Sequence, residues 1–299
     1  MTKIKKIAFI GLGTIGRPVA AHIARAGFEL TVFNRTDTRA IKLVDELKLE
    51  GISINLATNP AAAAENKDVV ICCVGNDQDV EQIVLGSNGA MEGLQPGSIL
   101  IDHTTTSANL ARKLWSASEQ KGFNFIDAPV SGGQIGAEQG RLAIMCGGTE
   151  RTFRKVASVL DCYASSVIHV GEAGAGQTAK MANQMCIAGI IGGLSEAVRL
   201  VQAAGLDTEK TFRAISSGAA QSWQMDNRWE TMVANEFDFG FAIDWMRKDL
   251  RYALDEAAIL GLSSPISSLV DQFYAEVQAN GGGRLDTSAL IKRLPTGEK

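Results

Sequence analysis

The sequence predicts an α/β fold in two parts, a doubly wound parallel sheet followed by an all-helical region. Up to about residue 170, short apolar runs alternate with runs of helical periodicity, as in parallel sheets covered by helices on both faces. From Gly171 onward the periodicity is helical and no strand signal is found. A length of 299 residues allows two domains. We therefore expect residues 1–170 and residues 171–299 to form one domain each.

The first domain is expected to contain strands that are buried on both faces, because its apolar runs alternate poorly. These runs are Ile4–Ile10, Leu30–Phe33, Asp68–Val74, Ser98–Asp102, Asn124–Asp127, Leu142–Cys146 and Ser166–Val170. Helical runs lie between the earlier ones, at Arg17–Ala26, Thr38–Leu47, Asp77–Leu85 and Ser107–Lys121. In such a sheet ligands bind at the carboxyl ends of the strands. We therefore expect Val74, Gly75 and Thr105 to contact a ligand.

A glycine-rich turn follows the first strand and precedes a helix. The order strand, G-x-G-x-x-G, helix is the dinucleotide-binding fingerprint, and the alternative is a plain tight turn. Gly11 permits the turn, Gly13 lets the backbone approach a pyrophosphate, and Gly16 lets the helix pack on the strand. The free N–H groups at the helix N-terminus favour phosphates. The residues expected to bind the cofactor are Gly11, Leu12, Gly13, Thr14, Ile15 and Gly16.

The end of the second strand indicates which dinucleotide is bound. An acidic residue at this place accepts hydrogen bonds from the ribose of NAD, whereas an arginine suits the extra phosphate of NADP. The sequence has Asn34, Arg35 and Thr36 there and no acid. The alternative is that Arg35 is only a solvated residue before a helix. We expect these three residues to favour NADP(H), with NAD(H) still possible.

A second polar turn, Ser131-Gly132-Gly133, follows the strand at Asn124–Asp127. It offers one hydroxyl and two unhindered N–H groups, which suit a carboxylate. Taken alone, the same three residues also fit an ordinary loop.

The stretch Gly171–Gly205 predicts one long helix, because apolar residues recur in it at steps of three and four. Its interior glycines weaken a helix unless another backbone approaches closely. Lys180, Asn183 and Gln184 share one face of this helix because of their spacing. The alternative for Lys180 is a packed stem whose ammonium group reaches water.

The rest of the second domain is predicted to be helical as well. The helical runs are Asp207–Ser216, Trp223–Ala234, Phe237–Gly261, Pro265 to about Asn280, and Thr287–Arg293.

Composition narrows the class of protein. A formal charge of −4 argues against a nucleic-acid partner. No signal peptide or membrane span is expected, because the first apolar run is short and breaks into glycines. The five cysteines contain no CxxC pair, and with only three histidines no metal site is expected. We therefore expect a cytoplasmic, metal-free protein with a small-molecule substrate and no membrane partner.

Four stretches of the sequence coincide with one family. They are IAFIGLGTIG, DAPVSGG, GAGQTAKMANQ and KDLRYALDEA, in order from about residue 7 to 257. With them the chain resembles the β-hydroxyacid dehydrogenases, which include 3-hydroxyisobutyrate dehydrogenase, tartronate semialdehyde reductase and glyoxylate/succinic semialdehyde reductase. The resemblance implies a Rossmann domain, a long interdomain helix and an all-α second domain.

The resemblance also implies roles for particular residues. Lys180 matches the catalytic lysine, and Ser131, Gly132 and Gly133 match the turn that binds the substrate carboxylate. Asn183 and Gln184 stand where the family usually has two asparagines, so Gln184 departs from the pattern. Lys248 matches a second lysine near the nicotinamide, and Thr105 would contact the nicotinamide or the substrate.

These roles predict an NADPH-dependent reductase of small carboxylated aldehydes, in which Lys180 is the general acid and base. One alternative is a 3-hydroxyisobutyrate dehydrogenase acting in the oxidative direction. A second is an imine reductase. That group also has the sequence Asn-Arg-Thr, but it lacks the catalytic lysine, so the presence of Lys180 weighs against it. A third is a non-catalytic NADP-binding module. The glycine- and alanine-rich helices suggest a homodimer or homotetramer.

Overall fold

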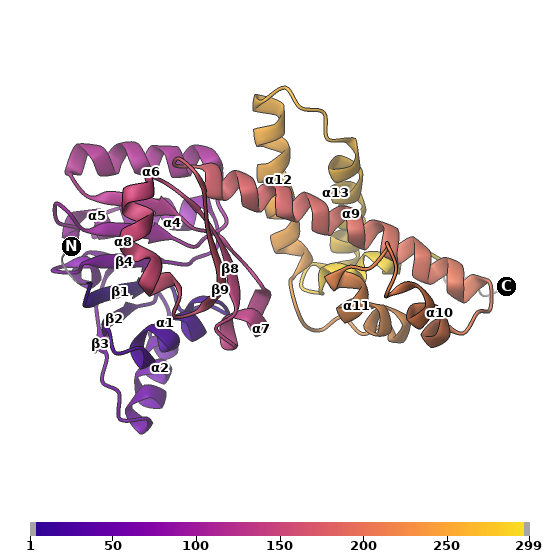
Figure 1. The fold of residues 1–299 in the computed structure, drawn as a ribbon, viewed down its shortest axis with the longest axis horizontal. Helices are drawn as coiled ribbons and strands as arrows, with labels where there is room; N and C mark the ends of the chain where they lie inside the picture. Colours follow the sequence, from indigo (N-terminus) through magenta and orange to yellow (C-terminus); the bar gives the residue numbers. More distant parts are fainter. Residues whose placement is uncertain (1–3, 296–299) are drawn as a thin grey trace. The chain divides into compact units, whose positions relative to one another are not determined.

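The computed structural model describes residues 4–295. The chain forms two compact units, Met1–Lys180 and Met181–Lys299, which are divided within the long helix α9 (Ala175–Ala203). The first unit is α/β and the second is helical, so the predicted fold class is confirmed (Figure 1). The domain boundary expected at residues 170 and 171 stays a prediction.

The first unit is built on one nine-stranded sheet with the order β3-β2-β1-β4-β5-β6-β8-β7, in which β9 pairs with β8. Strands β1 to β6 are parallel throughout. Beyond β6 the sheet is mixed, because β8 is antiparallel to both β6 and β7 and parallel to β9. The strands are β1 Lys6–Ile10, β2 Glu29–Phe33, β3 Asn55–Leu56, β4 Val69–Cys72, β5 Ile99–Asp102, β6 Asn124–Asp127, β7 Val130–Ser131, β8 Leu142–Gly147 and β9 Ala164–Gly171.

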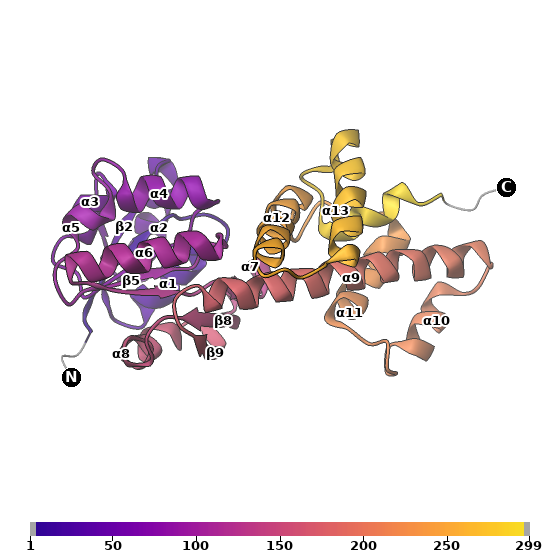
Figure 2. The ribbon, with the colours of Figure 1, turned by 90° about the horizontal axis from the view of Figure 1, so that it is seen from above.

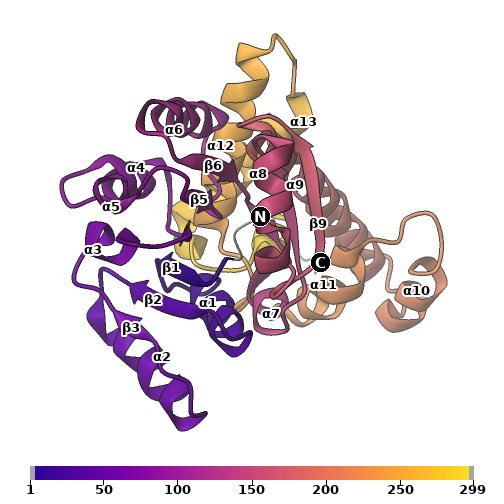
Figure 3. The same ribbon diagram turned by 60° about the vertical axis from the view of Figure 1, so that its left-hand side comes forward.

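Helices cover both faces of this sheet. Helices α1, α2 and α8 contribute to one apolar core, and α3, α4, α5 and α6 contribute to another on the opposite face (Figure 2). Figure 3 shows β1, β2 and β3 side by side at the end of the sheet near α2. The helices are α1 Gly16–Arg25, α2 Asp37–Leu49, α3 Pro60–Ala64, α4 Asp77–Leu85, α5 Ala90–Gly93, α6 Ala108–Lys121, α7 Gly133–Glu138 and α8 Glu150–Leu160.

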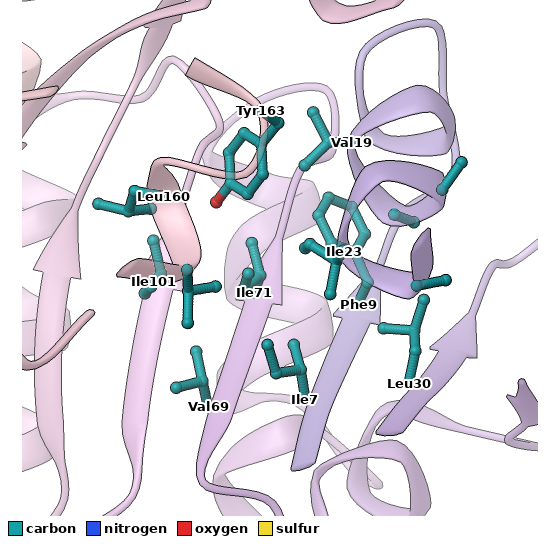
Figure 4. Close-up of a cluster of buried hydrophobic side chains, with 14 of the residues drawn as sticks. Ile7, Phe9, Val19, Ile23, Leu30, Val69, Ile71, Ile101, Leu160 and Tyr163 are labelled. Carbon is teal, nitrogen blue, oxygen red and sulfur yellow. The ribbon is translucent and has the colours of Figure 1, made fainter. Parts of the chain in front are cut away.

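Strand β1 shows why the apolar runs do not alternate. Ile7 and Phe9 belong to the core on one face, and Ala8 and Ile10 belong to the core on the other. All four are buried. Figure 4 shows the first of these cores, with labelled side chains from several elements: Ile7, Phe9, Val19, Ile23, Leu30, Val69, Ile71, Ile101, Leu160 and Tyr163.

The second unit contains the rest of α9 and four further α-helices. Five residues of α9 lie in its core, namely Ala188, Ile191, Leu194, Val198 and Val201. Gly192 faces α13, since a Cβ there would lie 3.4 Å from Val270 Cγ2, an ordinary van der Waals contact. The remaining elements are α10 Thr208–Ile215, α11 Trp223–Ala234, α12 Ile243–Ile259, α13 Pro265–Val277, the π-helix Gln278–Gly282 and the 3-10 helix Thr287–Arg293.

Helix α9 is long and apolar enough to cross a membrane by length and composition alone. In its most apolar window 39% of the residues are buried inside the protein, and core helices of soluble proteins pass the same test. The composition of α9 therefore does not by itself indicate a membrane protein.

The helix predicted from Phe237 begins only at Ile243. The intervening segment pairs with residues near Asp286 instead: Asp286 N–H donates to the Phe237 carbonyl and Thr287 N–H to the Phe241 carbonyl, each at 2.9 Å. The helical spacing of the aromatic residues was misleading here. The carbonyl groups of Phe237 and Phe241 accept hydrogen bonds from residues distant in the sequence and not from the next helical turn.

Candidate active site

The turn after β1 has the geometry expected of its three glycines. Gly11 has a φ of +97°, and a Cβ there would lie 2.3 Å from the Cys73 carbonyl oxygen. A Cβ on Gly16 would lie 2.0 Å from the Gly11 carbonyl oxygen and 2.9 Å from the Phe9 ring. Nothing lies within 4 Å of a Cβ on Gly13. Packing thus requires Gly11 and Gly16, while Gly13 leaves the space that an approaching pyrophosphate needs.

Asn34 supports this turn from the end of β2. Leu12 N–H donates to Asn34 Oδ1 at 2.8 Å, and Asn34 Nδ2 donates to the Thr36 carbonyl at 2.9 Å. The adjacent Arg35 side chain is 82% exposed, and its guanidinium lies 3.3 Å from Asp79 Oδ1. Asn34 therefore shapes the turn, whereas Arg35 presents a cation to solvent.

The loops after β4 and β5 are bonded to each other. Val74 N–H donates to Thr104 Oγ1 at 3.0 Å, and His103 N–H donates to the Cys72 carbonyl at 2.8 Å. The residues predicted to contact a ligand here, Val74, Gly75 and Thr105, are all half-buried. They follow neighbouring parallel strands at the carboxyl edge of the sheet, as expected.

Two titratable residues lie beneath these loops. Burial raises the pKa of Asp102 to about 6, against the hydrogen bonds that it accepts from Thr104 and Cys72. Burial also lowers the pKa of His103 to about 4. Since a carbonyl only accepts, His103 Nδ1 donates to the Ala128 carbonyl at 2.6 Å, and Nε2 accepts from the Tyr163 hydroxyl at 2.9 Å. His103 is therefore a neutral structural histidine, which removes it as a proton donor.

The turn Ser131-Gly132-Gly133 joins β7 to α7. Gly132 has a φ of +125° and Gly133 a φ of +60°, a conformation that favours glycine. Ser131 is half-buried, and both glycines are exposed. The turn is thus open to a ligand, and its binding of a carboxylate stays a prediction.

The first turns of α9 are fixed to the strand ends of the first unit. Asp127, at the end of β6, accepts Gly174 N–H at 2.8 Å and Gln177 N–H at 2.9 Å. Burial raises the pKa of Asp127, and these N–H donors oppose the rise. Lys180 follows on the same helix and is 7% exposed.

The other predicted site residues lie in the second unit. Asn183 Nδ2 donates to Gln184 Oε1 at 2.8 Å, and Gln184 Nε2 donates to Asp249 Oδ2 at 2.7 Å. Both the oxygen and the nitrogen of the Gln184 amide therefore form hydrogen bonds, and the bond to Asn183 orients that side chain. Lys248 lies 3.1 Å from Asp249 Oδ1 and lines a polar cavity of about 290 Å³.

Comparison with known proteins places this geometry in a family. Residues 6–171 match the model of the NAD-binding domain of 6-phosphogluconate dehydrogenase, and residues 174–294 match the NAD-binding model of NADP-dependent 3-hydroxyisobutyrate dehydrogenase. The chain is 34% identical to 2-hydroxy-3-oxopropionate reductase of Escherichia coli over 97% of each chain. It belongs to the β-hydroxyacid dehydrogenase family.

Two further relatives agree with this family. An uncharacterized oxidoreductase of Shewanella frigidimarina is 50% identical over 97% of this chain and 98% of its own. The structure of Mycobacterium tuberculosis 3-hydroxyisobutyrate dehydrogenase with L-serine superposes with a TM-score of 0.88, at 31% identity over 97% of this chain and 99% of that one. Like other β-hydroxyacid dehydrogenases, the protein is an oxidoreductase that uses a nicotinamide cofactor and acts on hydroxyl groups of small molecules.

Three residues of this β-hydroxyacid dehydrogenase were missed by sequence reasoning. Asp127 and Gln177 fix the start of α9, and Asp249 holds Gln184. Each stands inside one of the four family stretches, DAPVSGG, GAGQTAKMANQ and KDLRYALDEA. Their position in those stretches was an available signal, but their hydrogen-bond partners are distant in the sequence.

Proposed function

We propose that the protein is an NADPH-preferring reductase of small carboxylated aldehydes, with Lys180 as the general acid. The observation that supports this is the burial of Lys180, which is 7% exposed. A lysine whose ammonium group simply reaches water would be more accessible. A cation held in a water-poor site suits a carbonyl oxygen that gains negative charge during reduction.

The reduction needs a hydride at the carbonyl carbon and a proton at the carbonyl oxygen. A bound reduced nicotinamide supplies the hydride. Lys180 Nζ donates the proton as the carbonyl π bond breaks and the O–H bond forms, and the neutral amine then takes a proton from water. In the oxidative direction Lys180 accepts the hydroxyl proton, so an enzyme oxidising 3-hydroxyisobutyrate would use the same residue.

The residues at the carboxyl edge fit a dinucleotide. Gly13 offers open space at the helix start, and Gly11 and Gly16 fix the turn around it. Arg35 is exposed at the end of β2, where a 2′-phosphate would be recognised. The preference for NADPH over NADH rests on Arg35.

The aldehyde class rests on the turn Ser131-Gly132-Gly133, which is open and suits a carboxylate. The Escherichia coli relative, a 2-hydroxy-3-oxopropionate reductase, supports a substrate of this size and charge. A panel of glyoxylate, tartronate semialdehyde, succinic semialdehyde, 3-hydroxyisobutyrate and a cyclic imine, each with both cofactors, separates the alternatives. Turnover of the imine alone would favour an imine reductase, and no turnover at all would favour a binding module.

The test of Lys180 is Lys180→Met, which keeps the apolar stem and removes the acid. Loss of a positioned proton donor costs ~10²–10⁴-fold in rate, so kcat should fall by that factor. NADPH affinity should be unchanged, because the turn Gly11–Gly16 is untouched. The control is Lys113→Met, which alters an exposed lysine paired with Glu81. A folded Lys180→Met enzyme that binds NADPH and keeps most of its kcat would contradict the assignment.

We also propose a cytoplasmic homo-oligomer. All five cysteines are free, which fits a reducing compartment. The second unit exposes several large apolar side chains, which favour burial against another copy: Ile190, Leu200, Ile266 and Leu269. Sedimentation equilibrium would distinguish a dimer or tetramer from a monomer.

A further inference from the structure

The side chain of Gln177 bridges two backbone groups on either side of Thr105. Its Nε2 donates to the Thr104 carbonyl at 2.8 Å, and its Oε1 accepts Thr106 N–H at 3.0 Å. Gln177 and both of these partners are buried. One amide group therefore fixes the loop that carries the residue expected to contact the nicotinamide or the substrate.

The backbone of Gln177 is fixed to a second strand end. Its N–H donates to Asp127 Oδ2 at 2.9 Å, beside the bond from Gly174 N–H to Asp127 Oδ1. A Cβ on Gly176 would lie 2.5 Å from the Met145 carbonyl oxygen, so the helix start packs tightly here. Gln177 thus joins the loop after β5 to a helix start that cannot shift freely.

Lys180 lies three residues after Gln177 on α9, within the same compact unit. In an α-helix this spacing is slightly less than one turn, a rise of about 4.5 Å. The rotation of the helix at Gln177 therefore determines the direction in which the Lys180 side chain leaves it. The residue that holds the Thr105 loop therefore lies on the same turn of α9 from which the Lys180 side chain leaves.

We propose that Gln177 is a positioning residue, which fixes the Thr104–Thr106 loop and Lys180 relative to each other for proton transfer. The proposal rests on the proposed role of Lys180. Gln177 itself touches neither reacting atom. Its contribution is to hold two groups of the reaction within the small tolerance that transfer requires.

Two substitutions separate positioning from packing. Gln177→Met keeps the length of the side chain and removes both hydrogen bonds. A misplacement of about 1 Å can cost ~10²-fold in rate, so kcat should fall by up to that factor while the dissociation constant of NADPH is unchanged. The matched control is Gln202→Met on the same helix, where the amide only accepts from Arg199 at 2.7 Å. That control should keep the wild-type kcat.

Gln177→Glu should change the pH dependence of kcat, which a residue that only packs would not do. A protonated glutamic acid can still accept Thr106 N–H and donate to the Thr104 carbonyl, whereas a carboxylate cannot donate. Burial and the neighbouring acids Asp102 and Asp127 disfavour the charged form, and Lys180 favours it. The ratio of kcat in Gln177→Glu to kcat in the wild type should therefore rise as the pH falls.

Hydrogen exchange of peptides covering residues 103–107 gives a readout that is independent of turnover. The Thr106 amide should exchange faster in Gln177→Met, and peptides covering residues 11–16 should not change. An unchanged kcat per NADPH-binding site in Gln177→Met, a flat Gln177→Glu ratio, or unchanged exchange would each overturn the proposal. If the wild type turns over no substrate, the proposed function fails, and the exchange experiment still decides whether Gln177 holds the loop.

Discussion

At the scale of single residues, the ion pair of Arg35 and Asp79 differs from the buried contacts of the first unit because it is exposed to solvent. The Arg35 side chain is 82% exposed and its partner lies 3.3 Å away. Solvent screens such a pair, so the pair contributes little to stability. A 2′-phosphate, which carries more charge than one carboxylate, would therefore displace Asp79 at low cost. On the proposed NADPH preference, Asp79 would moderate the attraction of Arg35 for phosphate without abolishing it.

The first prediction at this scale concerns cofactor choice. Arg35→Asp replaces a cation by the acid that suits the ribose of NAD, so the ratio of kcat/KM for NADPH to that for NADH should fall by at least ~10-fold, the effect of ~1.4 kcal/mol. Steady-state kinetics with both cofactors measures this. Asp79→Asn is the matched control, and it should raise the ratio or leave it unchanged. An Arg35→Asp enzyme with the wild-type ratio would show that Arg35 is only a solvated residue.

At the scale of elements, the turn between β7 and α7 combines an unusual backbone with an open surface. Gly132 and Gly133 have φ values of +125° and +60°, and both are exposed. A side chain at Gly132 would meet Leu142 Cδ2 at 3.2 Å. The turn is therefore exposed, and its backbone conformation at Gly132 favours glycine.

The prediction for this element is that Gly132→Val raises KM for acidic aldehydes and leaves NADPH affinity intact. The β-branched residue disfavours the positive φ and moves the N–H groups that would hold the carboxylate. Gly27→Val introduces the same residue at a φ of +86°, with nothing within 4 Å of its Cβ. That control should lose stability without a change in KM. Equal KM values for Gly132→Val and the wild type would refute the role of the turn.

The elements also show what sequence reasoning reaches and what it does not. Strand β1, its glycine turn and α1 follow from local pattern, because burial on both faces and close packing require those residue types. Segment 237–242 was expected to be helical and instead pairs with residues near Asp286. In the sequence Gln177 is an ordinary polar residue of a predicted helix. Its hydrogen bonds to Thr104 and Thr106 are known only from the structure. Local sequence patterns therefore predict single elements, but they do not predict contacts between segments that are distant in the sequence.

At the scale of the whole molecule, two neighbouring buried groups affect stability in opposite directions. The pKa of Asp102 is raised from 3.8 to about 6, so folding takes up a proton and stability falls as the pH rises between these values. The pKa of His103 is lowered from 6.5 to about 4, so the unfolded chain binds the proton and stability rises over nearly the same range. The two effects largely cancel in the intact protein.

Asp102→Asn should therefore expose the contribution of His103. The asparagine keeps an oxygen for the Thr104 N–H and does not titrate. Between about pH 4 and about pH 6 the free energy of unfolding of this variant should rise relative to the wild type by about 2 kcal/mol, since one pKa unit corresponds to about 1.4 kcal/mol and the titration is incomplete at both ends of this range. Denaturant unfolding at a series of pH values measures the difference. The control is Asp45→Asn, at an exposed position, whose free energy of unfolding should change with pH as it does in the wild type. The same pH dependence in Asp102→Asn and the wild type would contradict the prediction.

The continuity of α9 has a consequence for how this sequence can diverge. The helix runs unbroken from Ala175 to Ala203, past Lys180 and Asn183. Inserting or deleting one residue between those two would turn every later side chain by about 100° around the helix axis. Substitutions there alter one side chain at a time, whereas a change of length would misdirect all that follow. Descendants of this gene should therefore vary in length at exposed connections such as residues 217–221, and preserve the residue count along α9.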